Sequence, residues 1–332
     1  MEDREYNKPR KLIMAIKSLY EEPINTIRGE RENKVWFRTM TGVRQGSVLS
    51  PLLFILFLDK CLKRIGIRQD RDHTLVYADD AAIITPSVEN LQEVLGRCDE
   101  VLRGMGMRMN KEKTVVMVIS REREEMEVNI EETRLKQVKK FNYLGVIIDE
   151  QGRLDEELKE RIKKFTGNVS MLYPLLKEGG IPREVKVLMY KTILRPILLY
   201  GSECWALNTI QKNKLEAVEM RVLRIIKGVT LRDRLRSREI REDLNIEPII
   251  EYVERNQLRW YGHLKRMDEG ERLRRMLEWR PEGRRRAGRP RKRWMEAVSE
   301  AVESRGRTLA EVEEDRQYED RRGWRQFWRT ST

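Results

Sequence analysis

The chain has 332 residues, of which 39% are apolar and 37% are charged. That length accommodates two or three domains, and that apolar content is sufficient for buried cores, which argues against wholesale disorder. The longest apolar run, Leu52 to Leu58, is far shorter than the roughly 20 residues that span a bilayer, and no cleavable leader opens the chain. We therefore expect no membrane-spanning segment, and a nuclear or cytoplasmic rather than a secreted protein.

Cysteine and histidine usage argues against structural metal. Cys61, Cys98 and Cys204 lie too far apart for a zinc knuckle and cannot pair completely, which fits a reducing compartment. His263 has no acidic or cysteine neighbour in sequence, so a packing or surface role is favoured over metal binding. Neither disulfide bonds nor structural zinc is expected.

The positive charge is uneven. Lys and Arg exceed Asp and Glu by 68 to 55, a net charge of +13, and the stretch from Arg272 to Arg293 contains eleven Lys or Arg against two acids. Guanidinium groups stay charged and bind two phosphate oxygens at once, so nucleic acid is the expected partner. The run from Glu156 to Lys164 instead mixes signs at i,i+4 spacing, which is typical of a solvated helix face.

The first 150 residues read as a mixture of helix and strand. Ser50 is a predicted N-cap and Pro51 the first helical residue of a helix that is apolar nearly all round, so this helix is expected to be buried. In chain order the predicted elements are a helix from Pro9 to Tyr20, a strand around Val35 and Phe37 that faces a core, a helix from Ser50 to Ile65, two short strands within Leu75 to Thr85, a helix from Ser87 to Met105, and strands at Thr114 to Ile119 and Phe141 to Ile148.

After residue 150 the apolar spacing becomes helical. A first helix from Leu154 ends before Gly179, a second runs from Arg183 past Tyr190 and bends near Pro196, and a third carries one apolar face of Leu215, Val218, Val222 and Ile225. These three read as a small bundle. Beyond Gly228 we predict Arg-rich helices at Ile249 to Met267 and Trp294 to Ser304, and Thr308 with Glu311 as a capping box that opens a last helix.

Two adjacent acids interrupt the apolar hairpin. Asp79 and Asp80 follow Tyr77 and Ala78, so the tight connection between the two strands would hold both carboxylates at one edge of the sheet. Repulsion between neighbouring carboxylates is costly unless a cation neutralises them, and Mg²⁺ or Mn²⁺ prefers such oxygen ligands. The alternative is a plain turn, because Asp is common at turns.

Further blocks flank this hairpin. Upstream lies a glycine-containing loop in which Gln45 offers a side-chain amide and Arg44 a guanidinium. Its sequence is Gly42-Val43-Arg44-Gln45-Gly46-Ser47-Val48-Leu49-Ser50-Pro51. Downstream, Lys113 places an amine just before a strand, and Phe141-Asn142-Tyr143-Leu144-Gly145 closes the mixed region.

The order and spacing of these blocks resemble the reverse transcriptases of non-LTR (LINE-type) retrotransposons, over roughly residues 5 to 230. Gly-x-x-Gln-Gly-x-x-Leu-Ser-Pro followed by Tyr-Ala-Asp-Asp is far more specific than either piece. The resemblance implies an α+β fold: a partial polymerase palm, with an antiparallel sheet backed by helices, at 1–150; a helical thumb-like region at 151–228; and an Arg-rich, mainly helical nucleic-acid-binding region at 229–332.

The resemblance also implies a role for each block in RNA-directed DNA synthesis from deoxynucleoside triphosphates on an RNA template and a DNA primer or target. Asp79 is a metal ligand in two-metal nucleotidyl transfer, Asp80 its neighbour, and Lys113 approaches the pyrophosphate. Tyr77 and Ala78 line the primer end, and Arg44, Gln45 and Gly46 position template and nucleotide. The primer grip corresponds to Phe141, Tyr143, Leu144 and Gly145.

The family's reaction needs a further aspartate on a palm strand well before the glutamine loop. Met1 lies too close to Gly42 for that strand, and Asp3 lacks its apolar flanks. The resemblance therefore implies an N-terminally truncated enzyme that polymerises poorly or not at all alone, and a protein partner is a candidate source of the missing strand. The alternatives are a non-catalytic RNA- or DNA-binding protein derived from a retroelement, and a chain with no stable fold because half a palm exposes a sheet edge.

The basic tail and its tryptophans leave several readings open. Gly288-Arg289-Pro290 matches the core of an AT-hook, which enters the minor groove of A·T-rich DNA; a nuclear-localisation cluster and general phosphate contact remain alternatives. The tryptophans beside arginines stack on bases or, as helical spacing favours, anchor small helices. The predicted nucleic-acid-binding residues are Arg284, Arg285, Arg286, Arg289, Arg291, Lys292 and Arg293.

Overall fold

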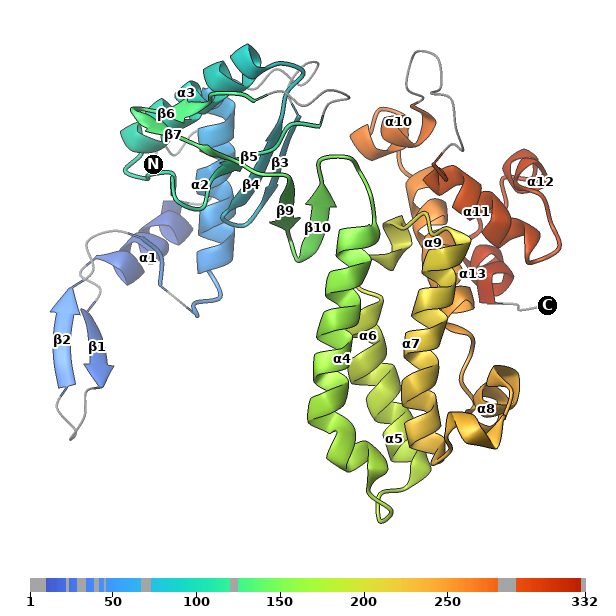
Figure 1. The fold of residues 1–332 in the computed structure, drawn as a ribbon. Coiled ribbons are helices and arrows are strands. Elements are labelled where there is room, and N and C mark those ends of the chain that lie inside the picture. Colours follow the sequence, from blue (N-terminus) through green and yellow to red (C-terminus); the bar gives the residue numbers. More distant parts are fainter. Residues whose placement is uncertain are drawn as a thin grey trace. The chain divides into compact units, whose positions relative to one another are not determined.

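The computed structural model describes residues 10–21, 24–28, 34–38, 42–44, 46–66, 73–119, 125–279 and 291–329. These residues divide into two compact units (Figure 1). The first unit contains the chain up to Val116 together with Glu125–Gln137, and the second contains Met117–Glu124 and everything from Val138 onward. The hairpin around Gly145 therefore belongs to the second unit.

The first unit begins with helix α1 (Arg10–Tyr20) and an antiparallel hairpin of β1 (Ile24–Arg28) and β2 (Lys34–Arg38). Strand β1 was not predicted, because Ile24 and Ile27 do not alternate with period two. The expectation that the second strand faces a core is wrong: Trp36 is 64% exposed and Phe37 is 40% exposed.

Helices α2 (Ser50–Ile65) and α3 (Val88–Gly104) pack on each other around a small apolar cluster, and a larger cluster lies between α3 and the short strands that contain Val116 and Ile130. The side chain of Ser87 caps α3 by accepting from the amide of Asn90 at 3.2 Å. Ser50 is the first residue of α2 and makes no cap; its hydroxyl donates to the carbonyl oxygen of Arg44 at 2.6 Å. The expectation of a fully buried α2 is wrong, since only one side meets α3 and Ile55 is 60% exposed.

The remaining strands are short and pair two by two. The predicted strand at 114–119 is only two residues long, because Val115–Val116 pairs with only two residues, Lys136–Gln137. Three of these pairs are antiparallel and β5–β8 is parallel, so the mixture of helix and strand is confirmed, while the described strands form no continuous sheet. These strands are β3 (His73–Tyr77), β4 (Asp80–Ile84), β5 (Val115–Val116), β6 (Asn129–Ile130), β7 (Thr133–Arg134) and β8 (Lys136–Gln137) in the first unit, and β9 (Lys140–Tyr143) and β10 (Val146–Asp149) in the second.

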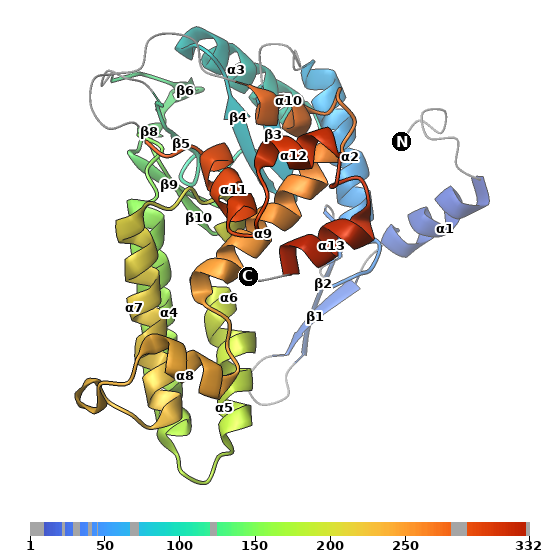
Figure 2. The same ribbon diagram turned by 90° about the vertical axis from the view of Figure 1, so that its right-hand side faces the viewer.

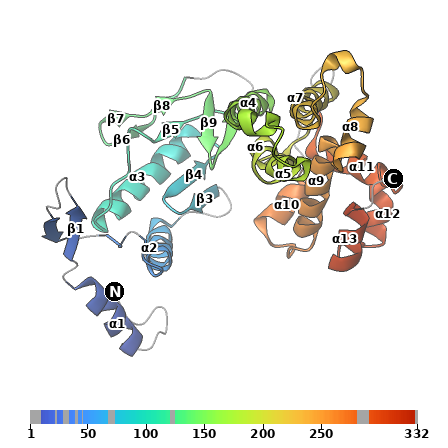
Figure 3. The same cartoon turned by 90° about the horizontal axis from the view of Figure 1, so that it is seen from below.

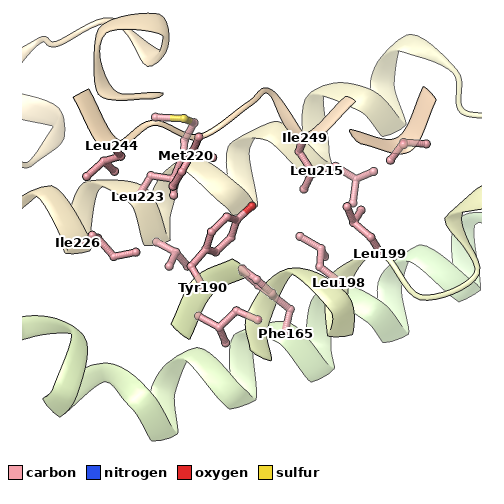
Figure 4. Packing of buried hydrophobic residues seen from close by; sticks show 14 of the residues in the cluster. Phe165, Tyr190, Leu198, Leu199, Leu215, Met220, Leu223, Ile226, Leu244 and Ile249 are labelled. Atoms are coloured by element: carbon pink, nitrogen blue, oxygen red, sulfur yellow. The ribbon is translucent and has the colours of Figure 1, made fainter. Parts of the chain in front are cut away.

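A helical bundle follows the β9–β10 hairpin. It comprises α4 (Asp155–Lys177), α5 (Arg183–Met189), a π-helix (Tyr190–Leu194), α6 (Arg195–Leu198) and α7 (Thr209–Lys227), seen nearly end-on in Figure 3. Near Pro196, where a bend was predicted, the α-helical pattern gives way to the π-helical segment, and the helix continues through it. Figure 4 shows Tyr190 at the centre of the core, between Phe165 and Leu223, all less than 2% exposed. The Tyr190 hydroxyl donates to the buried carboxylate of Glu219 at 2.6 Å.

The C-terminal helices form a second core in the same unit. They are α9 (Ile249–Lys265), α10 (Arg272–Glu278), α11 (Trp294–Glu303), α12 (Leu309–Glu314) and α13 (Arg321–Arg329), and α11 and α13 pack on α9 (Figure 2). Helix α8 (Ser237–Leu244) instead contributes Ile240 and Leu244 to the core of the bundle. The capping box of Thr308 and Glu311 is confirmed, but the helix it opens is not the last. Trp324 anchors this core at 1% exposure, whereas Trp279 is 70% exposed. None of the described helices is long and apolar enough to cross a bilayer.

Candidate functional site

The hairpin β3–β4 holds Asp79 and Asp80 at its tip. Tyr77 pairs with Asp80, so Ala78 and Asp79 are the two turn residues. Ala78 has φ 51°, a left-handed conformation that costs an alanine roughly 1–2 kcal/mol and that two-residue hairpin turns require. Both carboxylates are exposed at this tip, and Tyr77 beside them is 65% exposed.

A second hairpin in the same unit shows how a plain acidic turn is neutralised. Glu131 and Glu132 form the turn between β6 and β7, and Glu131 also has a positive φ of 54°. Glu131 forms ion pairs with Arg103 and Lys111. In the described part of the chain, no ion pair of this kind is formed by Asp79 or Asp80. The two turns therefore share a positive φ at their first residue and differ in charge balance.

The donor set at the Asp79 turn fits a divalent cation of the Mg²⁺ class. Such ions use one or two carboxylates and complete their shell with water and substrate phosphates, and carboxylate oxygen is their preferred ligand. Among the described residues, no group of three or more His, Cys, Asp or Glu is gathered at one point. The protein thus offers the ion two carboxylates here.

The loop before α2 is anchored by its arginine. The guanidinium of Arg44 lies 5.9 Å from the ring centre of Tyr20. The backbone carbonyl oxygen of Arg44 accepts a hydrogen bond from the hydroxyl of Ser50. Gly46 has φ 81°, which a side chain would disfavour. Gln45 lies outside the described residues. The interpretation of Arg44, Gln45 and Gly46 as a nucleotide-positioning loop remains a prediction.

Lys113 stands in a structured turn before β5. The side-chain oxygen of Asn110 accepts from the amides of Glu112 and Lys113, each at 3.1 Å, and Thr114 donates to the carbonyl oxygen of Asn110 at 2.7 Å. These bonds fix the backbone and leave the Lys113 side chain exposed. Its predicted role at pyrophosphate stays a prediction.

The segment Phe141–Gly145 is a hairpin turn with its preceding strand, where a single strand from Phe141 to Ile148 was expected. Leu144 and Gly145 have φ 48° and 83°, the pattern of a type I′ turn, which matches the twist of the strands. The rings of Phe141 and Tyr143 are stacked with centres 6.4 Å apart. A leucine at positive φ is strained, so neighbouring contacts must hold it.

Those contacts come from a buried ion pair that was predicted as a solvated face. Glu157 is fully buried, and its Oε1 accepts from Arg161 Nε at 2.6 Å while its Oε2 accepts from the amide of Ile147 at 2.7 Å. Arg161 also donates to the carbonyl oxygen of Gly145, and Tyr200 donates to that of Leu144 at 3.0 Å. The expectation for Glu156–Lys164 is wrong at this pair.

The other pairs of this helix are solvated, as predicted: Lys164 lies 3.8 Å from Glu160, with the two side chains 43% and 32% exposed. Lys140 binds Glu156 at 3.0 Å, with the two side chains 60% and 38% exposed, and this hydrogen bond and charge hold the pKa of Glu156 below its ordinary value.

The basic tail is described only from Arg291 onward; Arg284, Arg285, Arg286 and Arg289 lie outside the described residues. Arg291 donates to the carbonyl oxygen of Gln151. Lys292 forms an ion pair with Glu300 and donates to the carbonyl oxygen of Leu207 at 3.1 Å. Arg293 precedes α11, where its amide donates to Glu296 at 3.1 Å. Two of these three basic side chains therefore contact the protein itself.

Comparison with known proteins places these motifs in a family. Residues 2–148 match the family described as "Reverse transcriptase (RNA-dependent DNA polymerase)". The chain is 26% identical over 250 residues to the RNA-directed DNA polymerase from mobile element jockey of Drosophila melanogaster, covering 72% of this chain and 27% of that protein. It is 31% identical over 140 residues to the Pol polyprotein of retrotransposable element R2 of Nasonia vitripennis, a match that covers 37% of this chain and 14% of that protein.

Residues 2–148 thus belong to the reverse transcriptases, and the polymerase relatives come from non-LTR elements. A transposon-derived protein of Caenorhabditis elegans is similar over more of its own length: 28% identity over 250 residues, 70% of this chain and 85% of that protein. The chain spans about a quarter of the length of the jockey polymerase.

Proposed function

We propose that this chain carries the carboxylate hairpin, the primer-binding hairpin and the thumb of an RNA-directed DNA polymerase. The observation that carries the proposal is the tip of β3–β4, where a strained turn presents Asp79 and Asp80 together to solvent. Strain of this kind persists where the surrounding structure needs the geometry, and it gathers at functional sites. The substrates implied by the family are an RNA template, a DNA primer and deoxynucleoside triphosphates.

Each group has a separate task in this proposal. Asp79 binds a divalent ion, Mg²⁺ or Mn²⁺, and Asp80 adds negative charge beside it. An ion held there would supply Lewis-acid activation of the primer 3′-hydroxyl and stabilisation of charge on the phosphates. Lys113 contacts the pyrophosphate, and Arg44, Gln45 and Gly46 position the nucleotide and the template.

The second unit holds the primer in this proposal. Phe141, Tyr143, Leu144 and Gly145 contact the primer strand, and the bundle α4–α7 acts as the thumb. The buried Glu157–Arg161 pair supports this assignment, because it ties the turn of the hairpin directly to α4. A primer-contacting turn fixed in this way moves with the thumb helix.

A second candidate function is nucleic-acid binding without catalysis. The net charge of +13 favours it, because phosphate contacts alone supply nonspecific affinity.

Primer extension separates the two candidates. The full chain is assayed on a primed RNA template with Mg²⁺ or Mn²⁺, beside D79N/D80N and the matched acidic turn variant E131Q/E132Q. Synthesis that D79N/D80N abolishes and E131Q/E132Q retains is the expected result, and synthesis that survives in D79N/D80N contradicts the proposal. Binding of primer–template with no extension by any of the three proteins favours the second candidate.

A further inference from the structure

Helix α13 gathers positive charge on one face. Four of its nine residues are arginines and none is acidic. At 3.6 residues per turn, these four fall within an arc of about 100° around the helix axis. All four are exposed to solvent: Arg321, Arg322, Arg325 and Arg329.

The opposite face of α13 is fixed to α9. Trp324 is 1% exposed, and its indole nitrogen donates to the carbonyl oxygen of Leu258 at 3.0 Å. A Cβ at position 262 would lie 2.1 Å from that nitrogen, so Gly262 is what allows the two helices to approach this closely. Phe327 is 9% exposed on the same side. The arginine face is therefore presented in a fixed orientation.

Among the described residues, the charge on this face is not paired with carboxylates, although the segment before α13 is acidic. The segment from Trp294 to Asp320 contains nine acidic residues and three arginines, whereas the charged residues of α13 are all arginines. Within the described part of the chain, none of the four α13 guanidiniums pairs with a carboxylate. Arginines at i,i+4, such as Arg321 with Arg325, repel one another and weaken a helix. An anionic partner relieves that repulsion.

Nearby charge adds to the same effect. Burial lowers the pKa of Arg266, and the positive charge of Arg321 lowers it further, which places a fifth guanidinium beside the face. Arg266 is held in position by its bond to the carbonyl oxygen of Tyr318 at 2.6 Å. The positive field thus continues from α13 toward α9.

We propose that this face of α13 binds the phosphate backbone of a DNA duplex. A guanidinium contacts two phosphate oxygens at once, and a nine-residue helix is about 13 Å long, which is long enough for several phosphates. A duplex carries one charge per roughly 1.7 Å, so a rigid face gains more from it than from a flexible single strand. The wide major groove of B-DNA also admits a helix at its edge, whereas that of duplex RNA is deep and narrow. This site is independent of catalysis at Asp79.

The salt dependence of duplex binding tests the proposal. Binding of a labelled DNA duplex by the full chain is measured in EDTA, so that divalent ions play no part. The variant R321Q/R322Q/R325Q/R329Q is compared with R232Q/R234Q/R238Q/R316Q, which removes the same charge from exposed arginines elsewhere in the second unit. Four lost phosphate contacts lower the slope of log K against log salt by about 3 to 4. Between 50 and 200 mM salt, the wild type then loses about 100-fold more affinity than the α13 variant.

Each alternative result has a stated meaning. An α13 variant whose slope matches that of the control variant overturns the proposal. An equal or larger change on single-stranded DNA or duplex RNA overturns the choice of duplex DNA. Loss of the near-UV circular dichroism of Trp324 would show that the quadruple variant does not fold. In that case the double variants R321Q/R325Q and R322Q/R329Q are used. Each is expected to lower the slope by about 2, and no change in either overturns the proposal.

Discussion

Replacement of Arg161 by Met is expected to release the turn at Gly145 from helix α4. Glu157 is fully buried, and its remaining partner in this variant is the amide of Ile147. Removing one member of a buried ion pair costs about 3–5 kcal/mol, because the other charge stays buried without compensation. Arg161 also donates to the carbonyl oxygen of Gly145, so the strained turn loses a direct contact as well.

Hydrogen exchange of the hairpin measures this loss in the full chain. If the cost falls on local opening of β9–β10, a loss of about 3 kcal/mol makes the amides of 140–150 exchange on the order of 100-fold faster. The double variant E157Q/R161M is expected to exchange more slowly than R161M, because no unpaired charge is left behind. The matched control is E156Q, which breaks the exposed Lys140–Glu156 pair in the same region and should change exchange little.

Two outcomes refute this reasoning. Unchanged exchange at 140–150 in R161M would show that Arg161 does not hold the turn. Equal acceleration in R161M and in E156Q would show that burial of the Glu157–Arg161 pair makes no difference. Neither outcome depends on polymerase activity.

Three further perturbations have defined results. Gly262→Ala forces Trp324 out of its place on α9 and is expected to cost about 2–3 kcal/mol, with loss of the near-UV circular dichroism of that indole; an unchanged spectrum contradicts the packing. Burial raises the pKa of Cys98 to about 11, so its alkylation by iodoacetamide should rise about tenfold per pH unit between pH 8 and 10; a rate at pH 8 equal to that in urea contradicts this. Thr308→Ala removes the cap of α12 and should cost about 1 kcal/mol, seen as faster hydrogen exchange at 309–314 and absent in Ser299→Ala.

Features with a local cause were predictable from the sequence. The hairpin at Tyr77–Asp80 follows from two apolar runs separated by a tight connection, and the capping box at Thr308 follows from residue types three positions apart. The first bundle helix follows from apolar spacing alone. The family resemblance rests on the same local blocks, and the match over residues 2–148 confirms it.

Features that depend on distant contacts were not predictable. Glu157 and Arg161 show the same i,i+4 spacing as solvated pairs, and their burial follows from the packing of β10 against α4. The exposure of Ile55 depends on which elements pack against α2, and the apolar content of the helix does not specify those elements. Helix α13 contains a glycine, Gly323, that disfavours helix, and its stability comes from the docking of Trp324.

The central claim is that Asp79 binds a divalent cation, with the charge of Asp80 beside it, and iron-mediated cleavage tests this claim most directly. Fe²⁺ replaces Mg²⁺ in the full chain bound to primer–template, and the hydroxyl radicals that it generates cut the backbone near the metal. The account predicts cuts within 75–84 that Mg²⁺ suppresses, that D79N/D80N removes and that E131Q/E132Q leaves in place. Cuts that persist in D79N/D80N, or that centre on the turn at Glu131, would contradict the account.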